Sequence, residues 1–298
     1  MNRMFKKFFY SQKIAPYVFV LPFVITVLLF WIIPISNGVL LSFQDVLKDE
    51  WIGTKNYTRL LNDKVFLKAI FNSVKYMFGT LVLLIPFPMI FASLLNSKLM
   101  KHTGIFKSIY FIPALTSVVV AGTIFRLMFG EAESSLANQV IGLFGASPIK
   151  WLKGAYTSYF ILLLIACWRW TGVNILYFLA GLQSIPTELY EAAAIDGANK
   201  WQQFRKISLP LIKPTTVYVL TISIYAGMSM FLESYMVYKG NNSPNNIGLT
   251  IVGYLYRQGI EKRAMGYACA VGLILLIVIM VVNLTQLKLT GTFDKEEK

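Results

Sequence analysis

Six long apolar segments constrain this chain more than any other feature of its sequence. Each is about twenty residues or longer, the length that a helix needs to cross a hydrocarbon layer of roughly 30 Å. A water-soluble domain of this size cannot bury six such helices. The sequence therefore predicts an all-α polytopic membrane protein with six transmembrane helices, at 15–42, 69–95, 105–129, 156–182, 215–238 and 264–287.

The charged residues agree with a membrane location. They make up 14% of the chain, against roughly 25% in an average soluble domain. A net charge of +14 also raises the possibility of nucleic-acid binding, but lysine and arginine are scattered over many connecting segments without a basic stripe. Attraction to anionic lipid headgroups explains them better, and we expect no nucleic-acid partner.

The first apolar segment follows several basic residues, as a signal peptide would. A cleavable apolar region is only about 7–15 residues long and ends in a small-residue site, whereas this one is longer and contains Pro22 and Pro34. We expect a retained span and one transmembrane domain, with these boundaries: an N-terminal segment at 1–14, the membrane domain at 15–290 and a tail at 291–298.

The distribution of basic residues predicts the orientation. The N-terminal segment and the turn at 96–104 carry lysine or arginine without any acidic residue. Such segments face the cytoplasm in most membrane proteins. With six spans, both termini are predicted to be cytoplasmic.

The sequence offers few residues that could form a catalytic or metal-binding site. Cys167 and Cys269 fall inside predicted spans, and His102 is the only histidine, so no disulfide framework, metal site or catalytic set can be assembled. The chain also lacks the G-x-x-x-x-G-K-[ST] phosphate loop. We expect no catalytic residue, no bound metal and no ATP site in this chain.

The cytoplasmic segment 183–214 reads as two short helices joined by a turn. Thr187 is predicted to cap the first helix, with Glu188 in its first turn. Gly197 is predicted to end that helix in a left-handed conformation, and Asn199 with Gln202 to form a capping box for the second.

The second helix of this segment has an apolar stripe formed by Trp201, Phe204 and Ile207. Pro210 and Pro214 should then break the chain before the fifth span. A capped helix pair that projects from a membrane domain suits the docking of a soluble partner. The alternative is an amphipathic pair lying on the lipid surface.

The spacing of residues in this segment resembles the EAA loop of permeases in binding-protein-dependent ATP-binding-cassette importers. The matching residues are Glu191, Ala192, Ala193, Asp196, Gly197, Ile207, Leu209 and Pro210. In that family the loop forms coupling helices that sit in a cleft of the ATPase subunit. The resemblance therefore assigns these residues to ATPase coupling.

The resemblance extends over almost the whole chain and points to the six-span, first-permease type of carbohydrate importer. The further matching segments are 56–61, 110–113, 168–171, 180–186 and 265–268. One departure lies at 240–244, where many relatives have Gly-Gly-Pro in a loop that faces the binding protein.

Several consequences follow from the resemblance. It implies a bacterial-type inner membrane, a second permease, two ATPase subunits that bind ATP and magnesium, and an extracellular solute-binding protein. It also implies alternating access for a sugar, with an oligosaccharide favoured over the polyol phosphates that related branches import. A gradient-driven secondary transporter or channel is the alternative, but such proteins usually show internal repeats, and we find none here.

Ionisable groups inside a span are costly and mark functional candidates. Arg169 lies near the middle of the fourth span, where it would bind a hydroxylated solute or pair with Glu233. Lys75 and Arg126 lie nearer to span ends, where long side chains reach the interface, so no site is assigned to them. Further candidates for the solute pathway are Trp168, Asn174, Tyr177, Tyr225, Ser229 and Tyr267. These polar side chains would alternatively bridge helices.

Overall fold

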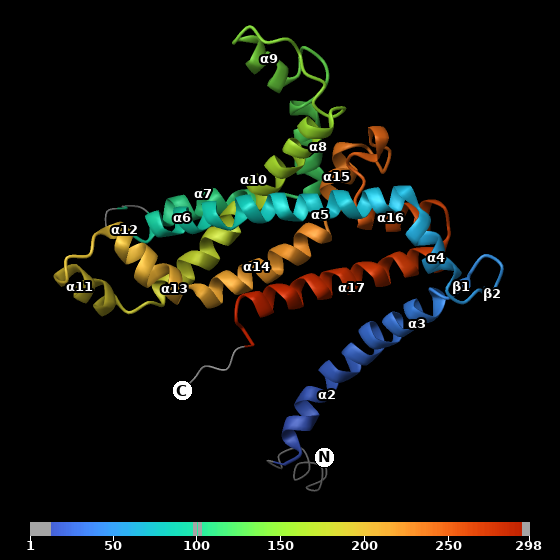
Figure 1. Ribbon diagram of the computed structural model, residues 1–298, viewed down its shortest axis with the longest axis horizontal. Helices are drawn as coiled ribbons and strands as arrows, with labels where there is room; N and C mark the ends of the chain where they lie inside the picture. The colour runs from blue at the N-terminus through green and yellow to red at the C-terminus, as the bar shows by residue number, and fades with distance from the viewer. Residues whose placement is uncertain (1–12, 98–99, 101–102, 294–298) are drawn as a thin grey trace, which may run out of the picture. The chain divides into compact units, whose positions relative to one another are not determined.

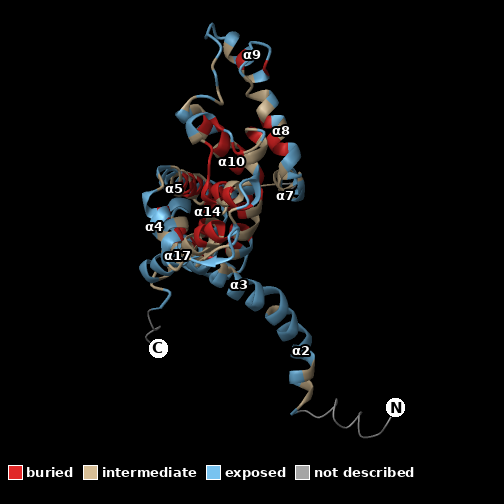
Figure 2. Ribbon diagram, turned by 90° about the vertical axis from the view of Figure 1, so that its right-hand side faces the viewer, coloured by how far each residue is buried: buried red, intermediate tan, exposed pale blue. Residues whose placement is uncertain are grey.

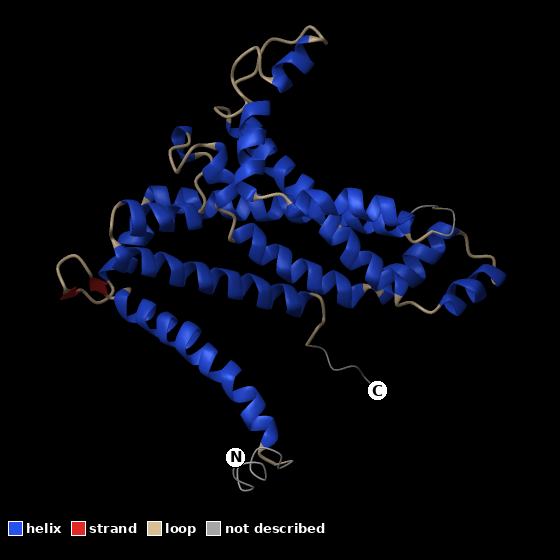
Figure 3. Ribbon diagram, turned by 180° about the vertical axis from the view of Figure 1, so that it is seen from behind, coloured by secondary structure: helices blue, strands red, loops and turns tan. Residues whose placement is uncertain are grey.

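The computed structural model describes residues 13–97, 100 and 103–293. Most of this part of the chain is helical, and its only strands are two short ones, as Figures 1 and 3 show. The prediction of an all-α polytopic membrane protein is confirmed. His102, the N-terminal segment before residue 13 and the tail after residue 293 lie outside the described residues.

The described chain divides into two compact units. Unit 1 comprises residues 13–62 and 255–273, and unit 2 comprises residues 63–254 and 274–293. The elements of unit 1 are α2 (Ala15–Val27), η1 (Leu28–Ile32), α3 (Ile33–Leu41), β1 (Gln44–Asp45), β2 (Glu50–Trp51), α4 (Lys55–Asn62), η4 (Arg257–Glu261) and the first part of α17 (Met265–Leu289).

In unit 1, β1 and β2 form an antiparallel hairpin in which Gln44 pairs with Trp51. The Asn56 amide donates to the carbonyl oxygens of Ser42 and Gln44 at 2.9 and 3.2 Å. Because Asn56 is buried, these bonds satisfy its side chain and tie α4 to the hairpin.

Unit 2 contains most of the helices. They are α5 (Lys64–Leu84), α6 (Pro86–Leu95), α7 (Thr103–Leu115), α8 (Val118–Met128), α9 (Leu136–Gly142), α10 (Ala155–Gln183), α11 (Thr187–Ile195), α12 (Lys200–Gln203), η2 (Phe204–Ser208), α13 (Leu209–Leu211), α14 (Lys213–Met228), α15 (Leu232–Val237), η3 (Pro244–Asn246) and the first part of α16 (Ile251–Tyr256).

Helix α10 is the centre of unit 2. It packs against α5, α6, α7, α8, α14 and α15, and Figure 2 shows buried positions along it. Ile161, Ile165, Ile175 and Phe178 are fully buried on it. Exposed apolar side chains cover much of the remaining helix surface, as expected for helices that face lipid rather than water.

Four predicted spans appear as long helices: 15–41, 64–95, 155–183 and 265–289. By length and composition these four can cross a membrane, and the number rises to six when each of two bent helix pairs is counted as one span. The second of these four is interrupted at Ile85, between α5 and α6.

The third and fifth predicted spans are not the single helices that hydropathy suggested. The third is divided into α7 and α8, which meet at 92°, and the fifth stops at Met228 and restarts at Leu232. Both apolar runs continue through the break, so hydropathy alone carries no signal for a bend.

The interruption at Ile85 has a clear cause. In a continuous helix the Leu84 carbonyl would accept from the backbone N–H of residue 88, but Pro88 has none. The Asn174 amide of α10 donates to this carbonyl instead, at 2.8 Å. A side chain from the central helix thus satisfies a buried carbonyl that proline leaves without a partner.

Gly172 sets how closely α7 approaches α10. A Cβ at this position would collide with the carbonyl oxygen of Tyr110 in the backbone of α7. We expect Gly172→Ala to force the two helices apart and to destabilise the protein by about 1–3 kcal/mol. Thermal unfolding of the detergent-solubilised chain would show this as a lower midpoint.

The matched control is Gly104→Ala in α7, where an added Cβ meets no atom within 4 Å. It should leave the midpoint unchanged or raise it slightly, because alanine favours helix more than glycine does. Equal midpoints for the two variants would contradict the close-packing argument.

Candidate coupling surface and translocation site

Helix α11 begins at Thr187, with Glu188 in its first turn as predicted. The predicted capping role of Thr187 is wrong. Pro186 occupies the N-cap position, and no side chain caps the helix. Thr187 therefore lies one residue inside the helix, at the first helical position.

The turn between α11 and α12 matches the sequence prediction. Gly197 has a φ of +82°, and the N–H of Ala198 donates to the Ala193 carbonyl at 2.8 Å. Asn199 and Gln202 form the reciprocal capping box, with bonds of 2.9 and 2.8 Å. The left-handed glycine and the capping box are both confirmed.

Side chains that the sequence analysis missed hold the two helices together. The Gln203 amide of α12 donates to the Tyr190 carbonyl of α11 at 3.4 Å, and the hydroxyls of Tyr190 and Ser208 are 2.8 Å apart. Gln203 and Ser208 are buried. Polar residues within a helix give no sequence signal for such partners, because the partners come from another element.

The predicted apolar stripe on the second helix is only partly correct. Phe204 and Ile207 pack against the core, whereas Trp201 is 67% exposed and stacks on Phe204 with ring centroids 5.9 Å apart. The cause is a π-helical turn at Phe204–Ser208, whose i→i+5 bonds change the helical phase.

The chain bends by 65° between Leu211 and Lys213. This bend lies between Pro210 and Pro214, so the predicted break before the fifth span is confirmed. The EAA-type residues lie on the helix pair before the bend: Glu191, Ala192, Asp196, Gly197, Leu209 and Pro210 are exposed, and Ala193 and Ile207 are half-buried. The exposed set gives a partner a surface to contact.

Arg169 and Glu233 form the predicted ion pair. The guanidinium nitrogen lies 2.8 Å from a carboxylate oxygen, and the two side chains are 10% and 14% exposed. The pair joins α10 to the first turn of α15, where the helix dipole also favours a carboxylate. One buried nitrogen, Nε of Arg169, has no hydrogen-bond partner.

The ion pair lies next to the break in the fifth span. Ser229 ends α14, Met230 is buried, and α15 starts at Leu232. Irregular backbone at membrane depth is tolerated only inside protein or beside a polar cavity. Transporters of several folds bind their solutes at such interrupted helices.

Three other candidates for the solute pathway make contacts elsewhere in unit 2. The Asn174 amide satisfies the Leu84 carbonyl, the helix-bridging role that the sequence left open. Trp168 packs on Phe125 with ring centroids 5.6 Å apart, and Tyr177 meets the edge of Tyr218 at 5.3 Å.

Tyr225 and Tyr267 differ in how far their side chains are exposed to solvent. Tyr225 is 60% exposed on α14, whereas Tyr267 is buried. The guanidinium of Arg59 lies over the Tyr267 ring, 4.6 Å from its centroid. This contact within unit 1 gives Tyr267 a structural role, because a cation over an aromatic face stabilises the packing.

Residues 8–289 match the family described as "Binding-protein-dependent transport system inner membrane component". The chain belongs to this family. The resemblance inferred from the EAA-type loop is therefore confirmed, and the chain is a permease subunit of the ATP-binding-cassette importer type. The secondary-transporter alternative is not favoured.

The permease is similar in sequence to permeases of sugar transport systems. It is 55% identical over 290 residues to the arabinooligosaccharides transport system permease protein AraP of Bacillus subtilis (strain 168), covering 97% of this chain and 92% of that protein. It is 30% identical to the lactose transport system permease protein LacF of Rhizobium radiobacter, covering 91% and 92%.

A solved structure shares the fold of the permease. It is a chain of a bacterial ABC transporter involved in the import of the acidic polysaccharide alginate, with a TM-score of 0.85 and 24% sequence identity. The match covers 99% of this permease and 100% of that chain.

We expect the ion pair to stabilise the permease only when both partners are present. Arg169→Met or Glu233→Met alone should destabilise it by about 3–5 kcal/mol, because each leaves a buried charge without a partner. The double variant should be more stable than either single one. Thermal unfolding of all four proteins in detergent measures this coupling, and purely additive effects would refute it.

Proposed function

We propose that this permease forms, with a second homologous permease, the path by which an ATP-driven importer takes up a sugar oligosaccharide. The observation that carries the proposal is the 55% identity to an arabinooligosaccharide permease over 97% of the chain. A lactose permease at 30% identity supports the same broad solute class. Arabinooligosaccharides are therefore the first solutes to test.

The helix pair α11–α12 would couple transport to ATP hydrolysis. It carries exposed EAA-type residues, its turn is fixed by Gly197 and the capping box, and the bend at Ile212 connects it directly to α14. Movement of a docked ATPase subunit would therefore be transmitted along α14 to the break that precedes α15.

ATP and magnesium would bind to two partner ATPase subunits, since the sequence of this chain has no phosphate loop. An extracellular binding protein would deliver the solute. A related structure is an alginate ABC transporter in complex with a pentasaccharide-bound periplasmic protein. The termini would lie in the cytoplasm, on the same side as the coupling helices.

The break between α14 and α15 is the best-supported solute contact within this chain. Arg169, Ser229 and Glu233 supply donors and acceptors there, and Nε of Arg169 has no bond of its own. As the pathway opens, sugar hydroxyls would compete for these groups. Trp168, on the same helix as Arg169, would offer an aromatic face to a sugar ring.

The solute proposal is tested by uptake. The permease co-expressed with its genomic partners in a host that lacks arabinooligosaccharide import should confer ATP-dependent uptake of arabinotriose, with little uptake of maltotriose. The reverse preference would contradict the proposed solute. Uptake of arabinotriose in ATP-depleted vesicles driven by a proton gradient would contradict the proposed energy source.

Gly197 tests the coupling role. Valine disfavours a φ of +82°, so Gly197→Val should distort the turn and reduce uptake at least tenfold while the complex still assembles. Gly145→Val is the matched control, because Gly145 also has a positive φ (+77°) and open space around it. Full uptake by an assembled Gly197→Val complex would refute the coupling role.

A further inference from the structure

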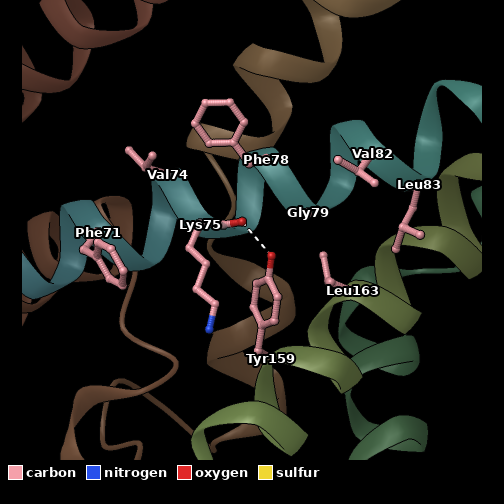
Figure 4. Close-up of a pocket in the computed structure, with 9 residues that line it drawn as sticks. All are labelled: Phe71, Val74, Lys75, Phe78, Gly79, Val82, Leu83, Tyr159 and Leu163. Carbon is pink, nitrogen blue, oxygen red and sulfur yellow. Dashed lines mark hydrogen bonds between the residues drawn. The ribbon is translucent and has the colours of Figure 1, made fainter.

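A groove on the surface of unit 2 lies between α5 and α10. It has a volume of about 560 Å³, and apolar side chains form nearly all of its lining. Figure 4 shows Phe71, Val74, Phe78 and Val82 along one wall, with Leu163 on the opposite helix. None of the solute-pathway candidates lines this groove.

A second, more polar pocket of about 210 Å³ shares three lining residues with the groove: Phe71, Lys75 and Tyr159. Lys68 and Lys75 both line it, and no acidic residue does. Neither lysine forms an ion pair within the described part of the chain. The two hollows therefore adjoin at these three residues, with the lysines at the polar pocket and apolar side chains along the groove.

Hydrogen bonds and aromatic contacts fix the residues around Lys75. The Tyr159 hydroxyl donates to the Lys75 carbonyl at 2.6 Å, which holds the ring beside the lysine (Figure 4). The Lys75 ammonium lies 4.1 Å from the centre of that ring and 5.6 Å from the centre of Tyr156. The Asn72 amide donates to the carbonyls of Asn246 and Leu249, each at 2.9 Å, which closes the far side.

The sequence places the polar pocket at the surface of the bilayer. The helix over 64–95 has 32 residues, more than the roughly 20 that cross the hydrocarbon layer. Lys64, Lys68 and Lys75 lie in its first part, whereas 76–95 contain no charged residue. Lys75 therefore lies at the headgroup boundary, together with Tyr156 and Tyr159, residues that favour this level.

We propose that this groove binds an anionic phospholipid, with its phosphate at Lys68 and Lys75 and an acyl chain between α5 and α10. The charge of the pocket selects the headgroup, because two lysines without a carboxylate attract an anion. The length and apolar lining of the groove suit an acyl chain.

Native mass spectrometry of the full-length permease, purified in mild detergent with its co-purifying subunits, tests the proposal. The probes are dioleoylphosphatidylglycerol and dioleoylphosphatidylcholine, which share acyl chains. The anionic lipid should bind preferentially. Lys68→Gln/Lys75→Gln should weaken its binding by about fivefold for each lysine, and Val82→Trp should block the groove.

Matched controls separate the site from general effects. Lys64→Gln/Lys150→Gln removes the same charge from residues that do not line either hollow, and Leu94→Trp adds a ring on exposed α6 surface. Both should bind the anionic lipid as the natural chain does. The readout is lipid binding, so the result does not depend on the proposed solute.

Three outcomes would overturn the proposal. The two lipids could bind equally, or the lysine variants could bind the anionic lipid as tightly as the natural chain. The third is a disulfide cross-link between Val82→Cys and cysteines introduced in the second permease, which would show that a protein helix fills the groove.

Discussion

The lack of water in the hydrocarbon core is the constraint on which this structure depends. Every interruption of a helix there exposes backbone groups that only the protein can satisfy. At Ile85 the free carbonyl of Leu84 receives the Asn174 amide from α10. Helix α10 can do this because it packs against α5, α6, α7, α8, α14 and α15.

The break between α14 and α15 is a second interruption of this kind. The break lies next to the ion pair of Arg169 and Glu233. Pairing the two charges offsets the large cost of burying either one alone. The 65° bend at Ile212 lies between α14 and the helices that carry the EAA-type residues.

The contacts of a polar side chain indicate its role more clearly than its residue type does. Asn174 and Tyr267 belong to the same chemical class as sugar-binding residues, yet each has a structural partner. Lys75, which the sequence analysis set aside as a residue near a span end, lies instead at the mouth of a lined groove. A single lysine at this level would not indicate a binding site. Lys68 in the same pocket and the adjoining apolar groove together do.

The sequence by itself determined the features that depend on near neighbours. These are the apolar lengths, the left-handed Gly197, the capping box at Asn199 and the EAA-type spacing that predicted the family. Only the tertiary structure decided where the third and fifth spans break. It also decided that α5 and α10 enclose a groove. Such features depend on contacts between distant segments, which local periodicity does not record.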